Sequence, residues 1–134
     1  MLMAFALAGC KANYIDISND PSVSRYIGLQ YTAKQDMEVS GINLPPGYGA
    51  TVDFYRLGKL YAVQHKAPEE ITTEVFPKGG TFTILKVYEC TNCLTLGKLR
   101  YLTLKTNDFK KPVNVPIKIA FHEIESEENV APIK

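Results

Sequence analysis

The chain has 134 residues, which suits one domain with one hydrophobic core. Hydrophobic residues make up 46% and charged residues 22% of the chain, and this excludes the composition typical of disordered proteins. A formal net charge of +1 provides no strong uniform field, so we expect no nucleic-acid partner. The chain contains no P-loop, nucleophile elbow, dinucleotide fingerprint or His-Glu-x-x-His motif, and we predict a protein that is not an enzyme and needs no cofactor or metal.

The chain opens with an uncharged apolar run that ends at Cys10 and gives way at once to the polar Lys11. Nine apolar residues cannot cross a hydrocarbon core as a helix, because that needs about 20. A buried N-terminal strand or helix is the alternative, although the run shows neither strand-like alternation nor a helix cap.

The residues Leu7-Ala8-Gly9-Cys10 resemble the lipobox of bacterial lipoproteins. The resemblance implies that residues 1–9 belong to a signal peptide that is incomplete at its start. It also implies that the Cys10 sulfur carries a diacylglyceryl group and that fatty acid, such as palmitate, holds the protein on a membrane. Lys11 stands where an aspartate favours the inner membrane, which points to the outer membrane, facing the periplasm.

After Cys10 the chain is polar and rich in turn residues as far as about residue 25, which predicts a tether over 10–25. A first irregular strand over Asn13–Ile17 is the alternative. From residue 26 to 122 we expect a β-domain made of short runs separated by turn signals. The expected strands before the last one are 26–33, 36–44, 50–57, 60–65, 71–76, 81–89 and 94–105.

A restrained turn over 45–49 contains Tyr48 between two glycines. An exposed aromatic side chain on such a loop is a candidate contact for a partner. Covering the mouth of a barrel is the alternative role for Tyr48.

The turn Pro77-Lys78-Gly79-Gly80 predicts a hairpin that leads into the strand 81–89. Along that strand the apolar residues change sides between Ile84 and Leu85, so we expect a central strand that is either covered on both faces or bulged. Residues 76–87 are similar to hairpins of bacterial SH3-like barrels. The resemblance implies a small barrel and raises peptidoglycan binding as one function.

Cys90-Thr91-Asn92-Cys93 joins two strand-like segments, and three interpretations compete. A structural disulfide is favoured, because this spacing suits a bridge across a tight turn in an oxidising compartment. A thiol oxidoreductase would need a reactive thiol at a helix N-terminus, which the strand-like sequence that follows does not predict. A zinc site would have to recruit His65 and His122, which lack the usual paired spacing.

The alternation of apolar and polar residues over 113–121 predicts a half-buried strand that exposes Asn114 and Lys118. Pro116 cannot donate to a ladder, so we expect an edge position or a bulge there. The acidic segment 123–134 has no periodicity and is predicted to be a mobile tail. The strand that we expect here buries Val113, Val115, Ile117, Ile119 and Phe121.

These patterns predict an all-β fold with seven or eight short strands and little helix, either a small SH3-like barrel or a sandwich. The leading functional hypothesis is a lipid-anchored module that binds a periplasmic protein, as an assembly accessory, an immunity-type inhibitor or a phage-exclusion factor. The alternatives are a tethered thiol-disulfide oxidoreductase that uses Cys90 and Cys93 and a peptidoglycan-binding module.

Overall fold

A computed structural model describes residues 13–43, 52–60, 70–93, 99–110 and 114–133. The predicted sites at Cys10 and Tyr48 lie outside these residues, as do His65 and Val113. Within the described part the fold is all-β, as predicted, with nine strands, one 3-10 turn and one short α-helix. The elements are β1 (Tyr14–Asp16), η1 (Ser24–Tyr26), β2 (Gln30–Ala33), β3 (Met37–Ile42), β4 (Phe54–Lys59), β5 (Glu70–Phe76), β6 (Thr81–Cys90), β7 (Arg100–Lys105), β8 (Ile117–Ala120), α2 (Phe121–Ser126) and β9 (Val130–Pro132).

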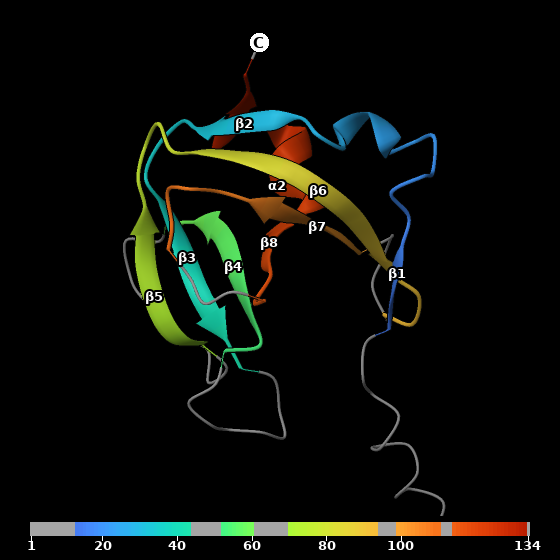
Figure 1. Cartoon of the computed structure of the whole chain (residues 1–134), viewed down its shortest axis with the longest axis horizontal. Coiled ribbons are helices and arrows are strands. Elements are labelled where there is room, and N and C mark those ends of the chain that lie inside the picture. The colour runs from blue at the N-terminus through green and yellow to red at the C-terminus, as the bar shows by residue number, and fades with distance from the viewer. Residues whose placement is uncertain (1–12, 44–51, 61–69, 94–98, 111–113, 134) are drawn as a thin grey trace, which may run out of the picture.

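The nine described strands form one sheet in the order β5-β3-β4-β8-β7-β6-β2-β9, and β1 pairs with the far end of β6. All pairs are antiparallel except β4 with β8, which run parallel. The sheet curls round its own core, as Figure 1 shows. This arrangement agrees with the prediction of a small barrel or sandwich.

Residues 77–80 form a corner between β5 and β6, and the hairpin predicted there is wrong. β5 pairs with β3, whereas β6 pairs with β1, β2 and β7, so the strands on either side of the turn are not partners. Gly79 N–H donates to the Ala33 carbonyl, and Ala33 N–H donates to Gly80. The chain therefore bends between β2 and β3 and again between β5 and β6, and the two bends lie side by side (Figure 1). Gly79 has φ +86°, a conformation that glycine adopts without strain.

β6 carries a bulge, which is one of the two arrangements that its sequence pattern allows, and it lies inside the sheet as predicted. The register with β7 shifts between Ile84 and Lys86. The extra residue keeps Ile84 and Val87 on the core side, both fully buried, and leaves Leu85 45% exposed on the surface. The strand therefore places its larger apolar side chains in one core instead of two.

β8 is shorter than predicted, and it is an interior strand between β4 and β7. Its alternation is as expected where it is described, because Ile117 and Ile119 are buried. The predicted edge position is wrong. Pro116 comes just before the strand, where its missing N–H interrupts no ladder, and its carbonyl accepts the Tyr55 N–H at 2.9 Å. Lys118 is half-buried instead of exposed, since aromatic rings surround it.

The segments on both sides of the predicted β-domain also belong to the fold. On the N-terminal side, the segment predicted as a tether contains β1, and Val23 is fully buried in the core. On the C-terminal side, the segment predicted as a mobile tail contains most of α2 and all of β9, with Ile124 and Val130 in the core. The apolar residues of both segments show no local period, yet Val23, Ile124 and Val130 pack into the core that the other strands form.

Candidate functional site

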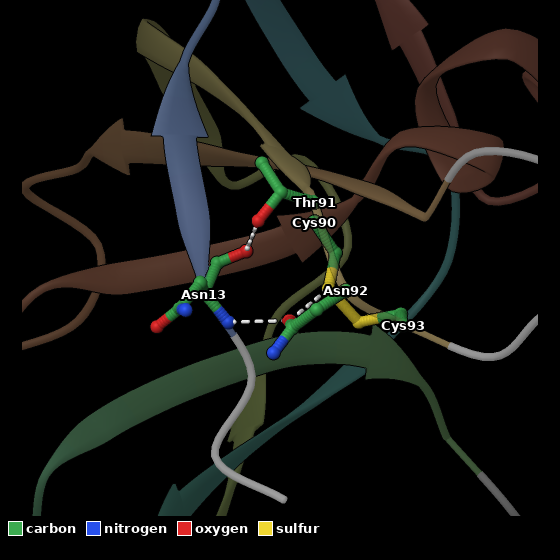
Figure 2. The surroundings of a disulfide bond; sticks show 5 residues. All are labelled: Asn13, Cys90, Thr91, Asn92 and Cys93. Atoms are coloured by element: carbon green, nitrogen blue, oxygen red, sulfur yellow. Dashed lines mark hydrogen bonds between the residues drawn. A yellow bond between two sulfur atoms is a disulfide. The ribbon is translucent and has the colours of Figure 1, made fainter. Parts of the chain in front are cut away.

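A disulfide closes the Cys-Thr-Asn-Cys turn, and the turn forms hydrogen bonds with Asn13, the first described residue. The Sγ atoms of Cys90 and Cys93 are bonded, with the Cα atoms 5.7 Å apart. The side chain of Asn92 accepts the Asn13 N–H at 2.7 Å, and the Asn13 carbonyl accepts the Thr91 N–H at 2.8 Å and its hydroxyl at 3.1 Å (Figure 2). The bridge therefore holds a turn to which β1 is attached, and we name this unit the disulfide corner.

The surroundings of Cys90 do not match the helix-capped cysteine of a thioredoxin-like site. Cys90 is the last residue of strand β6, and its N–H donates to the Leu99 carbonyl at 2.9 Å. The Glu89 carboxylate accepts a hydrogen bond from the Arg100 guanidinium at 2.9 Å. Without a helix N-terminus at Cys90, nothing among these contacts favours a thiolate there. Two bonded sulfurs also offer no thiolate ligand to zinc.

Removing the disulfide is expected to lower stability without removing function. For such a small loop the chain-entropy relation gives about 2 kcal/mol of unfolding free energy lost on replacing Cys90 and Cys93 together by Ser. Urea unfolding under non-reducing conditions measures the loss, and adding a reductant should change the unfolding of the natural chain but not that of the double variant. Catalytic thiol exchange with a protein substrate would contradict this structural role.

The outer face of the sheet carries a cluster of four aromatic rings and one lysine, next to the disulfide corner. Lys118 Nζ lies 4.2 Å from the centre of the Phe54 ring, 4.4 Å from that of Tyr101 and 5.9 Å from that of Tyr14. The Tyr101 ring stacks on Tyr88 and meets Tyr14 edge to face, with centroids 5.5 and 4.6 Å apart. The cluster draws on five strands, and all five side chains are half-buried. We call it the aromatic–lysine cluster.

Burial in this cluster changes the proton affinity of two of its groups. It lowers the pKa of the Lys118 ammonium below 10.5, because the rings take the place of water. Burial, with smaller contributions from Tyr14 and Tyr88, raises the pKa of the Tyr101 phenol to about 12. In the described part of the chain the ammonium has no carboxylate within ion-pair distance. The cluster is therefore a cationic centre with aromatic walls that is open to solvent on one side.

The bulge of β6 creates a second feature on the same outer face, at the opposite end of the strand. An open groove of about 400 Å³ lies beside Leu85. The side chains of Gln30, Thr83, Lys105 and Asn107 make no hydrogen bond to another described residue. We call this the bulge groove. Its lining residues are Gln30, Thr81, Phe82, Thr83, Leu85, Lys105, Thr106 and Asn107.

The sequence predicted part of this arrangement. The link between Cys90 and Cys93 is present as expected, and His122 is exposed, beside Glu123 and not at the disulfide corner. The aromatic–lysine cluster was missed. The strand alternation places Tyr88 and Tyr101 on one face, but no local pattern shows that Lys118 lies among the rings.

In the described ranges no group of three or more His, Cys, Asp and Glu is placed to hold a metal ion. The helices described here are all too short or too polar to span a membrane. The fold and its surface features define a small β-domain. No protein-family model, no curated protein and no solved structure gives a significant match to the chain.

Proposed function

We propose that the chain is a lipid-anchored protein-binding module of the bacterial envelope, acylated at Cys10 and facing the periplasm from the outer membrane. The resemblance of Leu7-Ala8-Gly9-Cys10 to a lipobox supports the anchor. Two or more acyl chains on one cysteine would hold the protein firmly, since each buried methylene contributes about 0.8 kcal/mol.

The bulge groove is the observation that carries the binding role. A bulge in a central strand commonly re-aims a side chain, and here it turns Leu85 out of the core and leaves it 45% exposed. An apolar centre with polar groups around it is the usual composition of a protein interface. Around Leu85, the side chains of Gln30, Thr83 and Asn107 keep their hydrogen-bonding capacity for a partner.

A site-specific cross-link in cells tests the module. A photoreactive residue replaces Asn107 in the chain with its full native leader, and irradiation is expected to give one discrete adduct with an envelope protein. Leu85→Asp should lower the adduct yield about tenfold or more, as at a central interface residue. Val75→Asp is the matched control, because Val75 is 56% exposed on β5, which pairs with β3 and does not line the groove, and it should leave the yield unchanged.

Cys10→Ser is the second arm of the same experiment. We expect the natural chain to incorporate labelled fatty acid and the serine variant to remain unlabelled and uncleaved. Label that persists in Cys10→Ser would contradict the anchor. An adduct that is absent, or that responds equally to Leu85→Asp and Val75→Asp, would contradict the role of the groove.

A further inference from the structure

We propose that the aromatic–lysine cluster is a second membrane contact, which rests on the phosphate groups of anionic phospholipids beside the acylated Cys10. This inference rests on the proposed lipid anchor and adds how the anchored domain is oriented. It assigns different occupants to the two surface features, lipid headgroups to the cluster and a protein to the bulge groove.

The position of Tyr14 is the first argument. Tyr14 is four positions after Cys10, and a fully extended chain over four residue steps spans at most about 14 Å. The disulfide corner holds Asn13, so β1 stays paired with the end of β6. Tyr14 in turn contacts Tyr101 in the cluster. A domain tethered at Cys10 therefore keeps the cluster within reach of the headgroup layer.

The chemistry of the cluster is the second argument. Tyrosine is enriched at membrane interfaces because its ring is apolar and its hydroxyl is polar, and a lysine stem can lie along apolar surface while its ammonium meets a phosphate. Lys118 has three aromatic rings around its ammonium and no carboxylate partner among the described residues. A phosphate oxygen would supply the missing anion and stabilise the charged form that burial disfavours.

The charges around the cluster are the third argument. Arg56 lies directly across from Lys118 in the parallel β4-β8 pair, on the same face, and is exposed. The acidic Asp16 on this face lies opposite Tyr88 in the β1-β6 ladder, and its carboxylate is 3.8 Å from Lys86. Two basic side chains, those of Lys118 and Arg56, therefore lie side by side at the centre of this face, although the whole chain has a net charge of only +1.

The bulge groove lies clear of this contact. Its apolar centre Leu85 is three residues and its lining residue Thr83 five residues along β6 from Tyr88, which at the usual rise of a strand corresponds to about 10 and about 16 Å. β1 pairs with the C-terminal end of β6, where Tyr88 of the cluster lies, while the corner lies at the other end of β6 (Figure 1). The groove is lined by Thr81, Phe82 and Thr83, which follow that corner. One end of β6 can therefore meet lipid while the other meets a protein.

Vesicle binding tests the headgroup contact without the anchor. The full chain with Cys10→Ser is titrated with vesicles of phosphatidylcholine and phosphatidylglycerol at 3:1 and with pure phosphatidylcholine vesicles. Lys118→Gln in this background is expected to lower partitioning onto the anionic vesicles about fivefold, the usual effect of one basic residue at such a surface. Lys78→Gln, an exposed lysine in the corner turn, is the matched control and should have no effect.

Equal losses in the two lysine variants, or no binding to anionic vesicles, would overturn the proposal. A Lys118→Gln effect on the cross-linked adduct with no effect on vesicle binding would also overturn it, because the cluster would then contact protein. None of these outcomes changes the labelling of Cys10 or the response of the adduct to Leu85→Asp and Val75→Asp, so a failure here is distinct from a failure of the proposed function.

The depth of an introduced tryptophan in the membrane tests the orientation of the domain without any substitution at Lys118. The chain has no tryptophan, so one introduced tryptophan reports its own position. In the acylated protein on vesicles with brominated lipids, we expect Tyr88→Trp to be quenched and Val75→Trp, on the distant strand β5, to remain bright. Equal quenching at both positions would overturn the proposed orientation.

Discussion

Deleting residues 123–134 is expected to abolish cooperative folding, although this segment has the composition of a mobile acidic tail. Ile124 is 1% exposed and Val130 is 0% exposed, and burying two such side chains contributes about 3 to 6 kcal/mol. Small domains are stable by only about 5 to 15 kcal/mol, so the loss is of the same order as the whole stability. Urea unfolding followed by circular dichroism measures it.

Hydrogen bonds add to the expected effect of the deletion. β9 pairs with β2, Lys34 N–H donates to the Asn129 carbonyl at 2.8 Å, and the buried Asn129 amide donates to Glu123 at 2.9 Å. The matched control keeps the chain length and replaces the exposed Glu125 and Glu128 by Gln, which should leave the midpoint nearly unchanged. A truncated chain that unfolds at the natural midpoint would show that the segment is dispensable.

Ile117→Ala is expected to lower the free energy of unfolding by about 2 to 5 kcal/mol. Ile117 is 1% exposed and lies between Tyr55 on β4 and Leu104 on β7, so its loss leaves a cavity at the only described parallel pair in the sheet. Ile15→Ala deletes the same atoms from a side chain that is 49% exposed, and it should cost less than about 0.5 kcal/mol. If Ile117→Ala also lowers the free energy of unfolding by less than about 0.5 kcal/mol, the assignment of Ile117 to the core face is wrong.

β6 shows how much of the structure of a strand the spacing of its apolar residues can predict. The apolar residues from Phe82 to Val87 change sides at Leu85, and a bulge was one of two ways to accommodate them. Choosing between the two required the partners of the strand. β7 pairs with β6 on both sides of the bulge, and one shared core takes Ile84 and Val87.

The corner at residues 77–80 shows where local reasoning fails. A proline and two glycines between two strand-like runs predict a hairpin, because adjacent strands usually pair. Here the buried Phe76 and Phe82 both enter the central core, with ring centroids 6.4 Å apart, while the backbone of the turn bonds to Ala33. Such a contact between distant segments leaves no signal in the turn itself.

The sequence by itself determined the all-β class and the inward side of β8, and it favoured the disulfide between Cys90 and Cys93, because these depend on residues that are close along the chain. The tertiary structure decided the order of the strands, the inclusion of both terminal segments in the core, and the meeting of Tyr14, Phe54 and Tyr101 around Lys118. Side-chain period is a local property, whereas strand neighbours are chosen by the joint burial of apolar surface over the whole domain. A surface site assembled from five strands therefore becomes visible only once the sheet has closed around its core.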